Sequence, residues 1–158
     1  MAAVLLTKVF LICGWCLFAG LYGLYDGLLW SMAMCWWDKG LKPKLHPHRV
    51  AFVLRALVAV VFSLCIFDGL DEVSDHLLLF VIYIGCFGLM FSLFHNGVYN
   101  ETRHVLDGIR TGFFSSKHSS SGLTVKILGH EFQPFEFGFP ERLMMFLAGA
   151  ILLLAVPI

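Results

Sequence analysis

The chain has 158 residues, of which 59% are hydrophobic and 14% are charged. Soluble domains carry roughly 45–50% apolar and about 25% charged residues, so a soluble fold of this length could not hide so much apolar surface. The 11 basic and 11 acidic residues cancel, which leaves no global field to attract nucleic acid. The composition favours an integral membrane protein whose first partner is the lipid bilayer, and it argues against a nucleic-acid partner.

Four apolar blocks have the length of a transmembrane helix, which needs about 20 mainly apolar residues. They cover residues 4–25, 50–67, 76–95 and 140–158. Lys8 and Arg55 lie near the starts of the first two blocks, where a long side chain can reach the membrane surface. Strands are excluded because no alternating barrel pattern is present. The sequence predicts an all-α integral membrane protein with four transmembrane helices in a single polytopic domain.

A shorter apolar segment, residues 27–37, follows the first block. At 11 residues it is too short to cross the bilayer again. Its tryptophans, Trp30, Trp36 and Trp37, favour the level of the lipid headgroups. We expect this interfacial segment to extend the first helix or to lie along the membrane surface.

The links between the blocks differ in charge. Residues 38–49 hold four basic residues, the second link holds four acidic residues and no basic one, and residues 96–139 again hold four basic residues. Lysine and arginine accumulate on the cytoplasmic side of a membrane. We therefore expect a multi-pass protein whose first and third links lie in the cytoplasm and whose two termini lie on the other side.

The third link is the largest part expected outside the membrane, at about forty residues. Its serine-rich centre, residues 115–122, is typical of a flexible polar loop. The residues after this loop alternate between apolar and polar with turn formers between them, which favours a short hairpin or extended segments. An irregular aromatic loop is an equally good interpretation.

The stretch of residues 94–108 has the most informative polar pattern. If the third helix continues through it, seven hydrogen-bonding side chains line one helical face at a membrane boundary. We call this face the polar stripe; it consists of His95, Asn96, Tyr99, Asn100, Arg103, His104 and Asp107.

The polar stripe allows two interpretations. In the functional one, His95, His104 and Asp107 provide ligands for zinc, and Arg103 binds a phosphate or carboxylate. The two histidines are nine residues apart, so they share one metal only if the helix breaks, for which Gly97 is the candidate. In the structural interpretation, which we favour, the stripe is a hydrated interfacial face. No cofactor is strongly indicated.

Asp26 is the acidic residue nearest to hydrocarbon. An acid at membrane depth is a candidate functional residue, here a proton or ion site paired with Arg55 or Lys8. Alternatively the first helix ends at Asp26 and Gly27 caps it, because glycine after a helix satisfies the last carbonyls. Two further Asp-Gly pairs near expected helix ends suit the same explanation, which is the simpler one.

Three other patterns are weaker. Cys13 and Cys16 have the spacing of thiol oxidoreductases, but they lie within a span, where thiols stay protonated and inert. Glycines in residues 20–27 and 85–88 form small-residue faces that suit close helix packing, within the chain or between copies. Four histidines in the cytoplasmic links offer metal ligands that no geometry fixes: His46, His48, His118 and His130.

Three functional hypotheses follow. The first is a non-enzymatic membrane protein, either an accessory or structural subunit or a self-associating one, for which glycine-lined contacts and a polar stripe without ligand geometry would speak. The second is a membrane-embedded enzyme acting on a lipid or headgroup, which needs His104, Asp107 and a loop histidine to converge. The third is a small transporter or proton channel, which needs Asp26 or Arg55 to face a hydrated path.

Overall fold

The computed structural model describes residues 2–31, 47–67, 70–108, 112–115, 125–127, 130–132 and 137–156. Within these ranges the regular structure is helical apart from one antiparallel pair of three-residue strands, in which Val125 lies opposite Phe132. This pair lies in the segment for which the alternating pattern suggested a hairpin. The elements in chain order are α1 (Ala2–Leu29), α2 (Pro47–Leu64), α3 (Leu70–Asp75), α4 (Leu77–Asp107), β1 (Val125–Ile127), β2 (His130–Phe132) and α5 (Phe139–Ala155).

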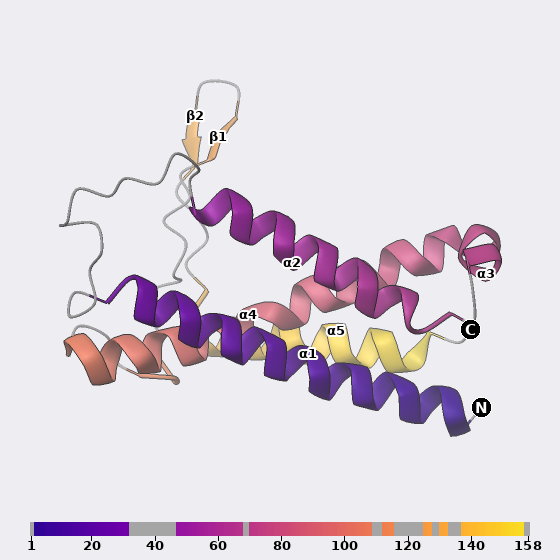
Figure 1. Cartoon of the computed structure of the whole chain (residues 1–158), viewed down its shortest axis with the longest axis horizontal. Helices are drawn as coiled ribbons and strands as arrows, with labels where there is room; N and C mark the ends of the chain where they lie inside the picture. The colour runs from indigo at the N-terminus through magenta and orange to yellow at the C-terminus, as the bar shows by residue number, and fades with distance from the viewer. Residues whose placement is uncertain are drawn as a thin grey trace.

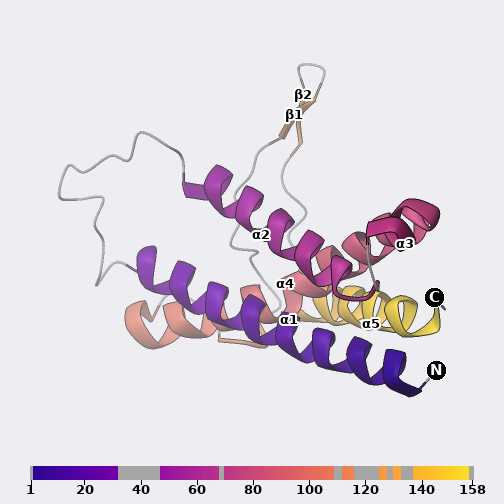
Figure 2. The ribbon, with the colours of Figure 1, turned by 45° about the vertical axis from the view of Figure 1, so that its right-hand side comes forward.

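The four long helices alternate in direction. α1 leads away from the end of the molecule that holds both termini, α2 returns to that end, α4 leads away again beside α1, and α5 returns (Figure 1). The short helix α3 lies at the end with the termini in both views (Figure 2). Two of the helices, α1 and α4, are long and apolar enough to cross a membrane.

Two helices continue further than expected. α1 runs to Leu29, and the Trp30 amide still donates to the Asp26 carbonyl at 3.0 Å, so the expected end of the helix at Asp26 is wrong. α4 runs through the polar stripe to Asp107 rather than ending near residue 95, so the link to α5 is shorter than the forty residues expected. The physical reason is that both extensions pack on each other, whereas hydropathy marks only the apolar part of a helix.

The ends of α4 and α5 follow ordinary capping rules. Gly108 has a φ of 66° and its amide donates to the His104 carbonyl, which is the glycine cap expected of an Asp-Gly pair. Pro140 lies in the first turn of α5, where its missing amide hydrogen costs nothing. The Asp-Gly pair at 68–69 lies outside the described residues.

An aromatic core joins α1, α2 and α4. The Trp15 side chain is 1% exposed, and its ring centroid lies 5.2 Å from that of Phe87 on α4 and 5.4 Å from that of Phe62 on α2. Tyr83 and Leu153 are also fully buried. Large rings with tilted contacts of this kind contribute more than their buried area alone, so this core sets the spacing of the helices.

Glycines let the helix backbones approach closely, as the small-residue face on α1 predicted. A Cβ atom on Gly23 would collide with the His95 carbonyl of α4, and one on Gly27 would lie 2.7 Å from the Thr102 Cβ. On α5, a Cβ on Gly149 would lie 2.7 Å from the Cys86 carbonyl oxygen. By contrast, nothing lies within 4 Å of a Cβ placed on Gly85.

This contrast predicts the effect of adding one methyl group. We expect Gly149→Ala to lower the free energy of unfolding by about 1–3 kcal/mol, because a backbone atom stands where the methyl would go. The matched control, Gly85→Ala, should leave stability equal or slightly raise it, since alanine favours helix. Thermal unfolding of the purified protein at a high detergent-to-protein ratio measures both. Equal stability of the two variants would contradict the close approach of α4 and α5.

Candidate functional site

A carboxylate, a guanidinium and an imidazole from three different helices meet inside the bundle. We call this group the ionic cluster: Asp26 on α1, Arg55 on α2 and His95 on α4. Arg55 Nη2 donates to Asp26 Oδ2 at 2.8 Å. His95 Nε2 lies 2.9 Å from the same oxygen and 3.1 Å from Arg55 Nη2. Of the two basic partners considered for Asp26 from the sequence, the structure brings Arg55 to it and not Lys8.

The ionic cluster is largely removed from solvent. The exposed fractions of the side chains are 3% for His95, 10% for Asp26 and 27% for Arg55. A charge taken out of water is costly unless it is paired and hydrogen-bonded, and here each charged group has an oppositely charged neighbour. From its position near the start of the second block, Arg55 was expected to reach the membrane surface. This expectation is wrong, because its side chain binds Asp26 inside the bundle.

Aromatic rings surround the cluster. The Arg55 guanidinium lies 4.6 Å from the centroid of the Tyr22 ring and 4.8 Å from that of Phe91. The His95 ring stacks on Phe91 at 4.8 Å and lies nearly parallel to Tyr99 at 6.5 Å. The faces of aromatic rings attract cations, the more so when water is excluded. The Tyr22 and Phe91 rings thus compensate part of the hydration that Arg55 loses.

The helices position the cluster through close approach and a hydrogen bond on the far side of the ring. Gly23 lies against the His95 backbone, so α1 comes close enough for Asp26, one turn later, to reach the imidazole. On the other side, His95 Nδ1 lies 2.9 Å from Asn96 Oδ1, and Asn96 Nδ2 donates to Ser92 Oγ at 3.1 Å. These contacts hold the ring in one orientation.

Some of the other side chains of the polar stripe make hydrogen bonds, and others are exposed to solvent. Arg103 donates to Asp107 and, at 3.2 Å, to the Tyr99 hydroxyl. Ser31, just beyond the end of α1, donates to Asp107 at 2.6 Å. The members of the stripe that are buried are His95, Asn96, Tyr99 and Asn100. The stripe is therefore mainly a contact between α4 and α1, and the expectation of a hydrated face is wrong for these residues.

The proposed zinc ligands do not converge. The helix is not broken at Gly97, and His104 lies exposed while His95 is buried. Within the part of the chain that the structure describes, no three His, Cys, Asp or Glu residues are grouped as metal ligands would be. The four link histidines lie outside the described side chains. Of the cysteine pair on α1, Cys13 is exposed and Cys16 half-buried.

A buried cation, Lys8, lies at the end of the molecule that holds the termini. Lys8 is 2% exposed, and its Nζ donates to the Val156 carbonyl at 2.6 Å and to the Tyr83 hydroxyl at 3.2 Å. Val156 ends α5, where unpaired carbonyls carry partial negative charge. The expectation that Lys8 reaches out to the membrane surface is wrong, because this helix end offers it acceptors inside.

A third cation, Arg142, was not singled out from the sequence. It is fully buried and donates to the carbonyls of Gly138, Phe113 and Ser115. Glu101 on α4 accepts the Phe113 amide at 2.8 Å. The segment 112–115 is thus held between α4 and α5 through its backbone. No sequence motif marks this arrangement, because the partners are peptide groups.

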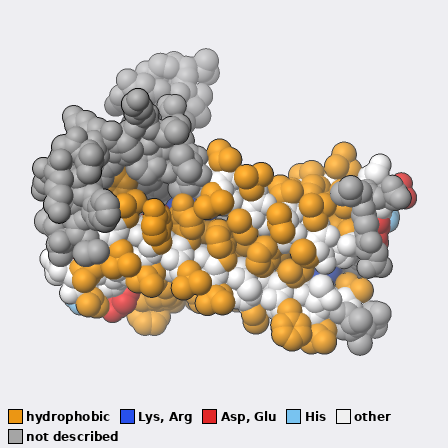
Figure 3. Space-filling model, viewed as in Figure 1, with side chains coloured by type: hydrophobic (Ala, Val, Ile, Leu, Met, Phe, Trp, Pro, Cys, Tyr) orange, Lys and Arg blue, Asp and Glu red, His pale blue; other side chains and the backbone are white. Residues whose placement is uncertain are grey.

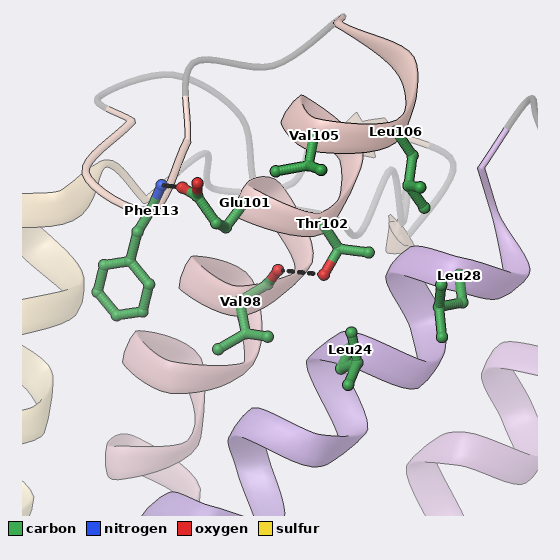
Figure 4. Close-up of a pocket in the computed structure, with 8 residues that line it drawn as sticks. All are labelled: Leu24, Leu28, Val98, Glu101, Thr102, Val105, Leu106 and Phe113. Carbon is green, nitrogen blue, oxygen red and sulfur yellow. Dashed lines mark hydrogen bonds between the residues drawn. The ribbon is translucent and has the colours of Figure 1, made fainter.

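An apolar groove of about 380 Å³ opens beside this segment, between α1 and α4. Figure 4 shows Leu24 and Leu28 on one wall and the α4 side chains on the other, with Phe113 and Glu101 at one side. One acidic side chain among apolar ones offers no set of groups for catalysis. The ionic cluster, not the groove, is the candidate functional site.

Comparisons with known proteins identify no relative: no family model, no curated protein and no solved structure matches the chain.

The ionic cluster predicts strong coupling between its members. Arg55→Met removes the guanidinium that pairs with the Asp26 carboxylate, and Asp26→Leu removes the carboxylate that pairs with the guanidinium. Removing one partner of a buried pair costs about 3–5 kcal/mol, and the partial exposure of Arg55 places it at the low end. We expect the double variant to lose less than the sum, with a coupling energy of about 0.5–3 kcal/mol, measured by thermal or denaturant unfolding.

The matched control pairs Arg55→Met with Lys8→Met, which removes a buried cation from the opposite end of the bundle. Their effects should add within about 0.5 kcal/mol, because distant sites without shared partners behave independently. Additive behaviour of Asp26→Leu and Arg55→Met as well would show that the two side chains do not interact.

Proposed function

We propose that the chain is a four-span integral membrane protein without catalytic activity, which serves as an accessory or structural subunit and associates through an exposed face of α4. The observation that carries the proposal is the use of the polar side chains. Several buried polar side chains that the structure describes, among them Lys8, Asp26 and Ser31, connect one helix to another, and the outer surface of the helices is largely apolar.

The apolar surface supports the membrane setting. Large hydrophobic side chains are exposed on every long helix, among them Phe10, Phe52, Leu78 and Ile151 with exposed fractions of 69%, 71%, 73% and 62%. In Figure 3 hydrophobic side chains spread over the middle of the molecule, while acidic and histidine side chains show at its two ends. Soluble monomers do not expose contiguous apolar surfaces of this extent. Lipid accounts for them.

Helix lengths agree with four spans. α2 and α5 have 18 and 17 residues, or about 25–27 Å at 1.5 Å per residue, close to the roughly 30 Å of the hydrocarbon core. They run beside α1 and α4 in alternating direction. Lys8 and Asp26 lie 18 residues apart on α1, or roughly 27 Å, so that Lys8 and the ionic cluster lie toward opposite membrane surfaces in this arrangement.

The charge of the links supports the orientation. The end of the bundle where α1 ends and α2 begins is joined by residues 38–49, the most basic stretch in the chain. The opposite end carries α3, with its acidic residues, and both termini. The excess of lysine and arginine supports a cytoplasmic position for the first end.

The alternatives find less support. An enzyme built on the polar stripe needs His104 and Asp107 in one pocket, but His104 is exposed and Asp107 is engaged by Arg103 and Ser31. A transporter needs an open hydrated path at Asp26, whose side chain is 10% exposed. The glycine-lined contact of α1 with α4 is the feature that the non-enzymatic hypothesis required.

A stripe on α4 offers the association surface. Leu78, Val81, Gly85 and Gly88 are spaced by three, four and three residues and are all exposed, so they form one line along the helix. In membranes, small residues on such a line allow a second helix to approach closely. The contact suits another copy of the chain or a helix of a membrane partner.

Labelling of single cysteines tests the topology. In a variant without the native cysteines, Ser74→Cys on α3 should react with a membrane-impermeant maleimide added outside sealed cells. Ser119→Cys in the third link should react only after permeabilisation. Labelling of both from the same side, or release of the protein by alkaline washing, would contradict four spans in this orientation.

Measuring the association state tests the second part. In lipid vesicles at increasing protein-to-lipid ratio, we expect Förster transfer between labelled copies, and we expect Gly88→Leu to weaken the association tenfold or more by blocking the approach. Among the described residues, nothing lies within 4 Å of a Cβ atom placed on Gly88, so the fold should be unchanged. The matched control is Ala148→Leu, which introduces the same side chain at an exposed position on α5. A wild-type protein that stays monomeric, or equal effects of both variants, would contradict self-association through α4.

A further inference from the structure

The ionic cluster contains a mismatch in its hydrogen-bonding groups. Both ring nitrogens of His95 face acceptors: Nδ1 is 2.9 Å from Asn96 Oδ1 and Nε2 is 2.9 Å from Asp26 Oδ2. Nε2 also lies 3.1 Å from Arg55 Nη2, which can only donate. A neutral imidazole has one N–H donor and one acceptor nitrogen, and an imidazolium has two donors. No single protonation state satisfies all three contacts.

The neutral and the protonated imidazole each satisfy two of the three contacts. In the neutral state, Nδ1–H donates to Asn96 and Nε2 accepts from Arg55, so that Arg55 bridges Asp26 and His95. In the protonated state, Nδ1–H donates to Asn96 and Nε2–H donates to Asp26. Arg55 then faces a second donor of the same charge at the distance where it had an acceptor, while both compete for one carboxylate oxygen.

The placement of Arg55 links this choice to the position of α2. The turn of α2 just before it is exposed, with fractions of 71%, 56% and 45% for Phe52, Val53 and Leu54. In Figure 1 the N-terminal half of α2 lies farther from α1 than its C-terminal half does. Arg55 contacts Asp26 and Tyr22 of α1 and Phe91 of α4. Among the described side chains of residues 52–55, Arg55 is therefore the one that ties this half of α2 to the bundle.

We propose that the ionic cluster is a proton-binding site, in which uptake of one proton from water by His95 Nε2 transfers Asp26 from Arg55 to His95 and releases the first half of α2. The charged and titratable groups around the ring are Tyr22 and Asp26 from α1, Arg55 from α2 and Tyr99 from α4. The net charge of Asp26, Arg55 and His95 changes from zero to +1. The inference rests on the membrane-spanning arrangement proposed above, which cysteine labelling tests separately.

The experiment uses the full-length protein at one copy per phosphatidylcholine nanodisc, so that association plays no part. Nitrogen-15 resonances of the histidine rings are followed from about pH 8 to pH 5, the range in which histidine changes charge, and His95 is assigned by its absence in His95→Gln. In parallel, spin labels at Leu21→Cys on α1 and Val53→Cys on α2, both exposed, report the distance between the helices.

We expect the His95 ring to gain a second nitrogen-bound proton and the distance between labels to lengthen with the same midpoint. In His95→Gln, which keeps hydrogen bonding but cannot take the proton, the distance should stay constant. A His95 ring that keeps one protonation state, a distance that does not follow its titration, or a lengthening that persists in His95→Gln would each overturn the proposal. The distance between the labels is measured with His95 intact, so a distance that stays constant from pH 8 to pH 5 overturns the proposal even if His95→Gln does not fold.

Discussion

The arrangement of three helices depends on one carboxylate. Asp26 lies one turn before the end of α1, whose other charged residue is Lys8, and its side chain is 10% exposed. An ionised carboxylate in such surroundings is tolerated only with a cationic partner and hydrogen bonds. Arg55 of α2 and the His95 ring of α4 supply these contacts, and they lie 29 and 69 residues away along the chain. Satisfying one charge therefore fixes the relative position of three separate helices.

This dependence explains why glycine and aromatic residues gather around the same level. The carboxylate reaches His95 only because Gly23 lets α1 touch the α4 backbone. Arg55, in turn, can leave water only because Tyr22 and Phe91 present ring faces to its guanidinium. The close approach at Gly23, the aromatic rings and the paired side chains together allow the Asp26 carboxylate to be buried. In the proposed membrane setting these polar and close contacts gain importance, because lipid competes with the helices for apolar side chains.

The sequence predicted the elements better than their ends and their contacts. Apolar blocks of bilayer length located all four long helices, because backbone groups in an apolar setting must form helix. The ends of α1 and α4 were misplaced, since hydropathy does not register that Asp26 and the residues after His95 are satisfied by another helix. From the sequence, Arg55 and Lys8 were both possible partners of Asp26, and charge alone could not decide between them. The partners of Lys8 and Arg142 could not be predicted from the sequence. Both side chains bind backbone carbonyls, and every residue has a backbone carbonyl.

Lys8, Arg55 and Arg142 show why the burial of a cation must be judged together with the groups that accept its hydrogen bonds. Lys8 lies at the C-terminal end of α5, where carbonyls are unpaired, and Arg142 binds carbonyls around a short segment between α4 and α5. Apart from the Tyr83 hydroxyl beside Lys8, these acceptors are peptide carbonyls, which carry no net charge. Arg55 instead contacts a carboxylate and an imidazole. Of these three cations, Arg55 alone contacts both an Asp and a His side chain, so a structural tie and the proposed proton-binding site coincide at the same residues.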